Sequence, residues 1–185
     1  MVHQRQVSRS HERVAARLVL AGALAAALTL GTGPARAASV GHVSTGHVST
    51  IDAATHQMTV TDNGRTVMTF TAGFGKPGFR TPTGTFHVLD KDAVVRMTSC
   101  SANITCDPHD PNYYDLVAHW AVRLTDSGLF VHAAPWDPAI GQVDSSHGCI
   151  HLSTEDARRF YDFSRVGDTV IVENTGGLDG GPSGP

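Results

Sequence analysis

The 185-residue sequence has no excess of positive charge: 14 lysines and arginines stand against 17 aspartates and glutamates, a net charge of −3 with histidines neutral. Five of the arginines lie within residues 1–37, where Glu12 is the one acidic residue. The rest of the chain therefore has 9 basic and 16 acidic residues, a net charge of −7. Nucleic acids bind basic surfaces. The charge thus argues against a nucleic-acid partner, although it does not identify a substrate.

Long hydrophobic runs are also scarce. The longest, "LVLAGALAAALTL" at residues 18–30, is shorter than the ~20 apolar residues that span a bilayer. Arginines precede it, and "GPARAAS" follows with small residues at Ala35 and Ala37 that suit a signal peptidase. We therefore predict a secretory signal at residues 1–37 and export of the chain, without membrane association after cleavage. A membrane anchor is the less favoured alternative, and no cysteine close behind the run offers a lipid anchor.

Cysteine is rare too, with three residues in the chain. Exported proteins meet oxidising conditions, and an odd number of cysteines leaves one unpaired within the chain. Cys100 and Cys106 lie close together in "SCSANITCDPHD" and could close a short disulfide loop. If all three cysteines were instead reduced, Cys149 would still be unpaired. Cys149 is therefore the expected free thiol.

Internal repeats are limited to "GHVSTGHVST" at residues 41–50, two copies of five residues. Two copies are too few for a repeat architecture. We interpret residues 38–50 as a linker, with a first strand as the alternative. Its histidines, His42 and His47, are expected to be exposed to solvent and not to bind metal.

Alternating apolar residues predict that the remainder is mostly β. An Asn63-Gly64 turn joins two alternating segments in a hairpin, and "TDSG" at residues 125–128 joins two more. The second hairpin places His132 near the end of a strand. Further strand-like segments are "TFHVL", "AVVRM" and "DTVIVEN". Between them, the long polar loop from Cys100 to Tyr114 is typical of a functional cover over a site.

A single helix is predicted in "STEDARRFYDF", directly after Cys149. Ser153 can cap it, acidic residues fill its first turn, and Ala157, Phe160 and Tyr161 follow at helical spacing. The catalytic domain is expected over residues 51–175. The last segment, 176–185, is too rich in glycine and proline to pack, and we expect a disordered tail.

The chemistry is expected in "SSHGCIH" at residues 145–151. A cysteine nucleophile needs a neighbouring group that accepts its proton, and His132 lies 17 positions earlier, across a loop between two strands. Gly148 permits a tight turn, and backbone N–H groups of the "HGC" turn could face a developing oxyanion. We expect Cys149 to be exposed on this loop.

Cys149 has two other interpretations. A buried structural cysteine is less favoured, because the flanking "SSHG" is polar and turn-like. A zinc site is the chemical rival: His147, Cys149 and His151 alternate, so on an extended segment they share a face, and His132 would complete four ligands. Ligands one residue apart are, however, tightly spaced for one zinc ion.

At these residues the sequence resembles the L,D-transpeptidases of bacterial cell walls, the YkuD-type catalytic domain. The segments that carry the resemblance are "GKPGFRTPTGTF", "FVHAAPWDPAIGQVDSSHGCIHLS" and "DTVIVEN", in this order. It covers nearly the whole exported chain and is most similar to the secreted enzymes of high-GC Gram-positive bacteria. The fold implied is a β-sandwich-like catalytic domain with one main helix after the catalytic cysteine and a loop over the cleft.

The resemblance also implies roles for individual residues. Cys149 corresponds to the nucleophile and His132 to the general base and acid. The loop and oxyanion hole would be shaped by Ser146, His147 and Gly148. The substrate would be bound by Tyr114, Ser127, Gly128 and His151.

Two positions depart from the family pattern. His151 stands where the family usually has Asn or Arg, so substrate recognition can differ there and, if the imidazole ionises, become pH-dependent. Ala133 stands where related enzymes often have Ser. If only the backbone carbonyl at this position orients the catalytic imidazole, nothing is lost.

The implied reaction needs neither metal nor organic cofactor. Cys149 would attack the third-residue carbonyl of a peptidoglycan tetrapeptide stem, release D-alanine and pass the acyl group to an amine of a second stem, forming a 3→3 cross-link. Carbapenem-type β-lactams are expected to acylate the same cysteine, and a monomer is expected. Alternatives are an L,D-carboxypeptidase that uses water as acceptor, and a non-catalytic wall-binding module. A papain-like peptidase is disfavoured because there the cysteine precedes the histidine.

Overall fold

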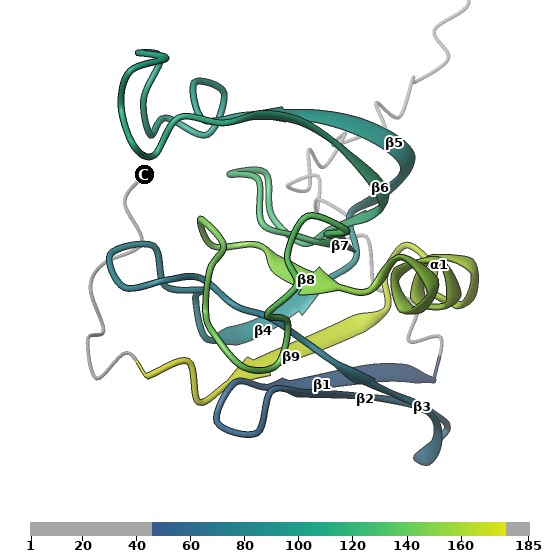
Figure 1. Cartoon of the computed structure of the whole chain (residues 1–185). Coiled ribbons are helices and arrows are strands. Elements are labelled where there is room, and N and C mark those ends of the chain that lie inside the picture. The colour runs from purple at the N-terminus through teal and green to yellow at the C-terminus, as the bar shows by residue number, and fades with distance from the viewer. Residues whose placement is uncertain (1–45, 177–185) are drawn as a thin grey trace, which may run out of the picture. The chain divides into compact units, whose positions relative to one another are not determined.

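The computed structural model describes residues 46–176. The predicted signal, the first GHVST copy and the tail from residue 177 lie outside the described residues. Within residues 46–176 the chain forms nine strands and one helix, arranged as two β-sheets (Figure 1). This agrees with the expectation of a mostly β domain with one main helix. No helix in this part of the chain is long and apolar enough to cross a membrane.

The first sheet has the strand order β3-β2-β1-β9-β4. β1 and β9 run parallel, and the other neighbours are antiparallel. Asn63 and Gly64 both have positive φ, which is the requirement of the tight turn predicted between β2 and β3. The strands are β1 His47–Asp52, β2 Gln57–Asp62, β3 Arg65–Thr71, β4 Gly84–His87 and β9 Thr169–Glu173.

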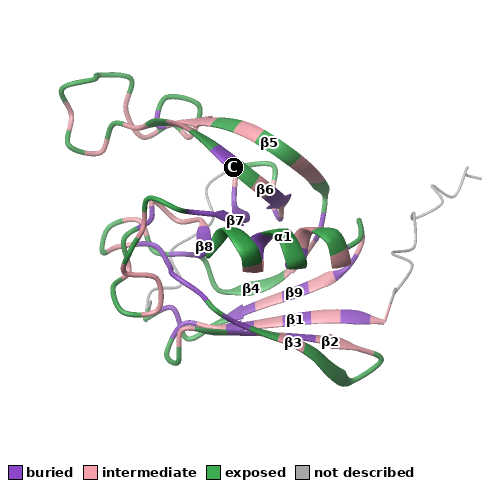
Figure 2. Ribbon diagram, turned by 45° about the vertical axis from the view of Figure 1, so that its right-hand side comes forward, coloured by how far each residue is buried: buried purple, intermediate pink, exposed green. Residues whose placement is uncertain are grey.

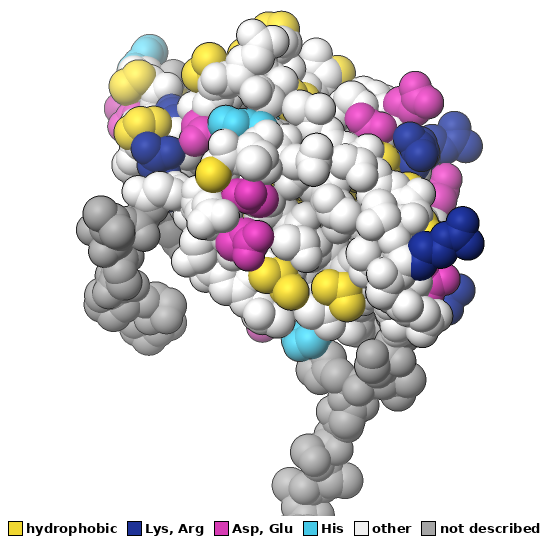
Figure 3. Space-filling model, turned by 90° about the horizontal axis from the view of Figure 1, so that it is seen from below, with side chains coloured by type: hydrophobic (Ala, Val, Ile, Leu, Met, Phe, Trp, Pro, Cys, Tyr) yellow, Lys and Arg dark blue, Asp and Glu magenta, His cyan; other side chains and the backbone are white. Residues whose placement is uncertain are grey.

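Residues of alternating polarity give this sheet one inner and one outer face. Ile51, Met58 and Phe70 are register partners across three strands, and all are buried. One position away, threonines pair across the same strands and turn outward. The outer surface seen in Figure 3 accordingly has mostly uncharged polar groups, with scattered charged side chains.

The second GHVST copy belongs to this sheet. β1 begins at His47, between β2 and β9, so residues 47–50 are a strand and not part of a linker. The expectation that His47 is exposed is wrong as well. Its side chain is buried, stacks on Phe163 and lies 3.0 Å from the carboxylate of Asp168.

The second sheet has the order β5-β6-β7-β8, in which only β7 and β8 are parallel. β5 and β6 are long and have many exposed or partly buried residues, whereas every residue of β7 and β8 is buried (Figure 2). The short buried strands therefore hold the rigid part of this sheet. The strands are β5 Asp90–Thr98, β6 Asp115–Arg123, β7 Phe130–Ala133 and β8 Ile150–Leu152.

Helix α1, Thr154–Phe163, follows β8 after one residue, Ser153. The Ser153 hydroxyl accepts the backbone N–H of Asp156, which confirms the predicted cap. Ala157 and Phe160 are the buried residues of the helix, and they join a core to which both sheets contribute. β8 and the loop before it are thus fixed by a packed helix immediately downstream.

Candidate active site

The parallel pairing of β7 with β8 brings the predicted site together. His132 and His151 are register partners in the two strands, and Cys149 is the residue directly before β8. All three line a cavity of about 760 Å³. The loop between the two strands therefore carries the nucleophile candidate back to the base candidate, as the 17-residue spacing predicted.

Hydrogen bonds fix the loop around Cys149. The Ser146 hydroxyl donates to the Cys149 carbonyl at 2.6 Å and accepts the Gly148 N–H at 3.0 Å. The buried Thr81 hydroxyl donates to the Gly148 carbonyl and accepts the Gly75 N–H. Gly148 has φ +119°, which a residue with a Cβ rarely adopts. Ser146 thus helps to fix the loop conformation. Because the Gly148 N–H donates to the Ser146 hydroxyl, it is not free to donate to an oxyanion.

Cys149 is a free thiol, half-buried and not exposed as expected from its loop position. Its S–H donates to the Gly128 carbonyl at 3.6 Å. Burial raises the pKa of the thiol to about 11, against a weaker opposite effect of a hydrogen bond from the Phe130 backbone. The Cys149 thiol is therefore protonated at neutral pH.

His132 is buried and neutral. Burial lowers the pKa of its imidazole to about 4, the neighbouring His151 adds to this, and a hydrogen bond to the Ala133 carbonyl opposes it. That bond joins Nδ1 to the carbonyl at 2.8 Å, so in the neutral ring Nδ1 carries the hydrogen and Nε2 has the lone pair. Ala133 in place of the family's Ser therefore does not prevent a backbone carbonyl from orienting the imidazole.

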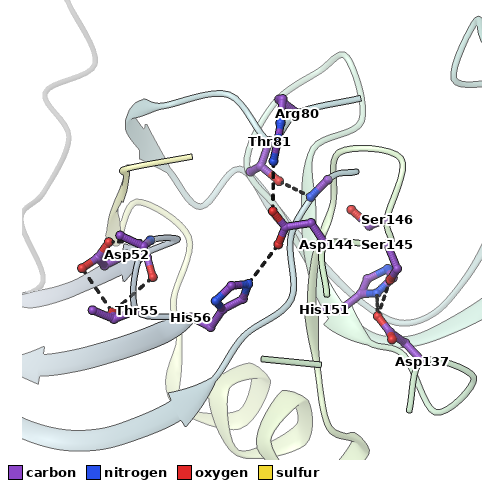
Figure 4. Close-up of polar contacts among 12 residues, drawn as sticks. Asp52, Thr55, His56, Arg80, Thr81, Asp137, Asp144, Ser145, Ser146 and His151 are labelled. Carbon is purple, nitrogen blue, oxygen red and sulfur yellow. Dashed lines mark hydrogen bonds and ion pairs between the residues drawn. The ribbon is translucent and has the colours of Figure 1, made fainter. Parts of the chain in front are cut away.

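His151 forms a buried pair with Asp137 (Figure 4). Its Nδ1 lies 2.8 Å from Asp137 Oδ2, which also accepts the Ser145 hydroxyl at 2.6 Å. Burial raises the pKa of Asp137, but hydrogen bonds from His151, Ser145 and the Ala139 N–H outweigh it and hold the pKa below its ordinary value. Burial lowers the pKa of His151 more than Asp137 raises it. The pair is consequently a carboxylate with a neutral imidazole.

His147, two residues before Cys149, lies in an aromatic environment. Its ring is 4.9 Å from Phe79 and 5.0 Å from Tyr114. Burial lowers its pKa, as does the nearby Lys76. Burial also raises the pKa of Tyr114, followed by the proximity of Cys149, so the phenol keeps its proton. The Tyr114 hydroxyl is therefore available as a donor in the cavity that it lines.

Ser127 and Gly128, the predicted substrate-contacting pair, also line the cavity. Gly128 provides the carbonyl that accepts the Cys149 thiol, and the Ser127 hydroxyl lies 3.0 Å from that of Thr125. All predicted catalytic, loop-shaping and substrate-binding residues therefore lie around one cavity.

A further carboxylate, that of Asp144, anchors the start of the loop. Asp144 bridges His56 Nε2 and Arg80 Nη1, each at 3.0 Å (Figure 4). His56 lies in the turn between β1 and β2, and Arg80 precedes β4. The Cys149 loop is thus tied to the first sheet at a point five residues before the thiol.

The loop between β5 and β6 covers one side of the cavity. Cys100 and Cys106 form a disulfide within it, which leaves Cys149 as the free cysteine. Lys76 Nζ donates to Asn112 Oδ1 in the same loop at 3.0 Å. This hydrogen bond ties the covering loop to the segment between β3 and β4. The loop and the adjoining strands give the cavity an apolar wall of Met97, Ala102, Ile104 and Leu116.

No set of three or more His, Cys, Asp or Glu side chains within residues 46–176 could hold a metal ion together. His151 instead pairs with Asp137, and His147 lies among aromatic rings. Sequence analysis missed Asp137, Asp144 and Thr81 as parts of the site. The position of Thr81 directly before "PTGTF" was a usable signal, but nothing in the sequence pattern connected Asp137 with His151.

A family model described as the L,D-transpeptidase catalytic domain, YkuD, matches residues 46–172. The chain belongs to this family. The relatives found are mycobacterial L,D-transpeptidases, which agrees with the predicted resemblance to high-GC Gram-positive enzymes. "Probable L,D-transpeptidase 3" of Mycobacterium tuberculosis is 48% identical over 103 residues, covering 55% of this chain and 37% of that protein.

Solved L,D-transpeptidases have the same fold. One in complex with imipenem matches with a TM-score of 0.66 and 38% identity, over 69% of this chain and 59% of that one. L,D-transpeptidase 3 from Mycobacterium tuberculosis, in complex with a faropenem-derived adduct, matches with a TM-score of 0.65 and 38% identity, over 70% and 60%. The chain covers less than two thirds of the length of each of these three proteins.

Proposed function

We propose that this protein is a peptidoglycan L,D-transpeptidase with Cys149 as nucleophile and His132 as general base and acid. One observation carries the proposal: the free thiol and an imidazole whose Nε2 keeps its lone pair line the same cavity in a chain of this family. Residues around the site supply the further requirements of acyl transfer.

The first half-reaction forms a thioester. His132 Nε2 takes the thiol proton as Cys149 Sγ attacks the carbonyl carbon of the third stem residue, and the carbonyl becomes an oxyanion. The Tyr114 hydroxyl and the Cys149 N–H are the donors that we assign to this oxyanion, because the Gly148 N–H is bound to Ser146. His132 then gives its proton to the departing amine of D-alanine.

The second half-reaction transfers the acyl group to an amine of another stem, which gives a 3→3 cross-link. No step requires a cofactor. Solved relatives hold imipenem and a faropenem-derived adduct, which supports the proposal that carbapenem-type β-lactams acylate Cys149 in this chain. We further propose that the protein is a monomer, exported by a cleaved signal, that acts in the cell wall or periplasmic space.

Product analysis tests the proposal. Purified protein incubated with a tetrapeptide stem is expected to release D-alanine and yield a cross-linked dimer that mass spectrometry identifies as 3→3. Release of D-alanine with tripeptide as the sole product, even with excess acceptor stem, would assign an L,D-carboxypeptidase instead. Absence of both products, together with a Cys149 thiol that does not react with thiol reagents, would indicate a non-catalytic wall-binding module.

A further inference from the structure

The corner of the cavity formed by Trp136, Asp137 and His151 has no task in the thioester-forming step. The His151 imidazole is almost buried, and its Nδ1 is bound to the Asp137 carboxylate. Nε2 is thus the ring nitrogen left to act in the cavity that His151 lines. Trp136 is 43% exposed, with its ring 6.2 Å from that of His151 and 6.0 Å from that of His132.

The charges of this corner suit a cation. Asp137 is ionised and 5% exposed, so little water screens its charge. An indole face attracts ammonium groups, and a neutral imidazole nitrogen accepts a hydrogen bond from them. The His147 side of Cys149 differs, because Lys76 lies close enough to lower the pKa of that histidine. An ammonium group is therefore favoured on the His151 side.

The second half-reaction releases one proton more than His132 alone can handle. An aliphatic amine is an ammonium ion at neutral pH, and its attack on a thioester yields an amide, a thiol and one additional proton. His132 returns one proton to the sulfur of Cys149. The other must leave the ammonium before attack. Water as acceptor needs no such step, because it is neutral when it arrives.

On the basis of the transfer function proposed above, we propose that Trp136, Asp137 and His151 form the acceptor-ammonium subsite, with His151 as the base that prepares the amine. The ammonium N–H bond breaks and its proton moves to His151 Nε2, with Asp137 stabilising the imidazolium through Nδ1. The neutral amine then forms the N–C bond to the thioester carbon. His151 returns its proton to water, and His132 then takes the second proton from nitrogen and delivers it to sulfur as the C–S bond breaks.

The positions of His132 and His151 agree with their separate roles, in which each accepts one of the two protons. They are register partners whose rings meet edge to face with centroids 5.0 Å apart, so one nucleophile nitrogen in the cavity can be near both. Simultaneous charging of both rings is disfavoured, because each is buried and like charges repel. The two proton transfers are therefore sequential, His151 first.

The decisive measurement is the ratio of cross-linked to hydrolysed product formed from one acyl-enzyme. This ratio is independent of how fast the acyl-enzyme forms. His151→Asn, which restores a residue common in the family, is expected to lower the ratio about tenfold or more with a stem-amine acceptor. Asp137→Asn should also lower the ratio of cross-linked to hydrolysed product. His119→Asn is the matched control, because His119 is exposed on β6 away from the cavity, and its ratio should equal that of the wild type.

Two small acceptor amines that differ in their protonation state test whether His151 acts by removing the ammonium proton. Ethylamine is an ammonium ion at neutral pH, whereas trifluoroethylamine, of similar size, is mostly neutral. His151→Asn should lower transfer to ethylamine far more than transfer to trifluoroethylamine. Equal losses with both amines, or a wild-type ratio in the variant, would overturn the assignment of His151. If the wild type forms no thioester by intact mass, the transpeptidase function fails, which is a different result.

Discussion

His132 and His151 are register partners on parallel strands β7 and β8, with their imidazole rings edge to face at 5.0 Å. The two rings have different hydrogen-bond partners. Nδ1 of His132 faces the Ala133 carbonyl, whereas Nδ1 of His151 faces the Asp137 carboxylate. Strand register thus places a carboxylate-linked imidazole beside His132, the base that we propose for Cys149.

Replacement of Cys149 by alanine should abolish both cross-linking and carbapenem adduct formation, because no other free cysteine exists in residues 46–176. Intact-mass spectrometry after incubation with imipenem measures the adduct. A Cys100→Ser/Cys106→Ser double variant is the control and should still gain the adduct mass. An adduct on Cys149→Ala would show that the nucleophile is another residue.

The rate of acylation by a carbapenem should be nearly constant between about pH 7 and 9. A thiol with a pKa of about 11 remains protonated over this range, and an imidazole with a pKa of about 4 remains neutral, so the reactive pair is fully populated. In His132→Gln the thiolate must form unaided. Its slower acylation should then rise roughly tenfold per pH unit. A comparable rise in the wild type would mean that acylation depends on the small thiolate fraction and not on the thiol–imidazole pair.

Reduction of the Cys100–Cys106 disulfide should weaken stem binding and destabilise the domain. Ala102 and Ile104 lie inside the disulfide loop and line the cavity, so loosening the loop disturbs the apolar wall. A loop this short predicts a loss of about 2 kcal/mol in the free energy of unfolding. Urea denaturation and KM for the stem, with and without dithiothreitol, measure the two effects. The double serine variant should not respond to the reductant, and a wild type that is equally indifferent would contradict the expectation.

Asp144→Ala should slow acylation about three- to tenfold and lower the free energy of unfolding by about 1 kcal/mol. The substitution removes both bonds from the carboxylate to His56 and Arg80, which tie the Cys149 loop to the first sheet. Asp162→Ala is the matched control. It breaks an exposed ion pair with Arg158 on α1, where a change near zero is expected in both measurements. Equal effects of the two substitutions would remove Asp144 from the support of the loop.

Local patterns predicted much of this domain. The β2–β3 hairpin, the β6–β7 hairpin and the Ser153-capped helix follow from alternation, turn residues and caps that act over a few positions. The motif around Cys149 and its spacing from His132 located the cavity. What remained open were contacts made by tertiary packing.

The Asp137–His151 pair shows why those contacts could not be predicted. Asp137 lies in a loop without a periodic pattern, and its side chain reaches His151 only because β8 returns parallel to β7. The protonation of Cys149 has a similar cause. Its flanking residues are polar, which suggested exposure, but Gly128 and neighbouring elements from elsewhere in the chain enclose the sulfur. Burial of a loop residue depends on segments that the loop sequence does not contain.

The central position of β1 in the first sheet determines when the domain can complete its fold. β1 pairs with β9, at the far end of the described chain, and Val48 is the register partner of Thr169. Until β9 has been synthesised, β1 has an unpaired edge and Ile51 lacks its neighbour Val172. Pairing over such a sequence distance is intrinsically slow, because loop closure precedes the gain from contacts. The first sheet can therefore be completed only after β9 has been synthesised, and a chain that ends before β9 cannot close it.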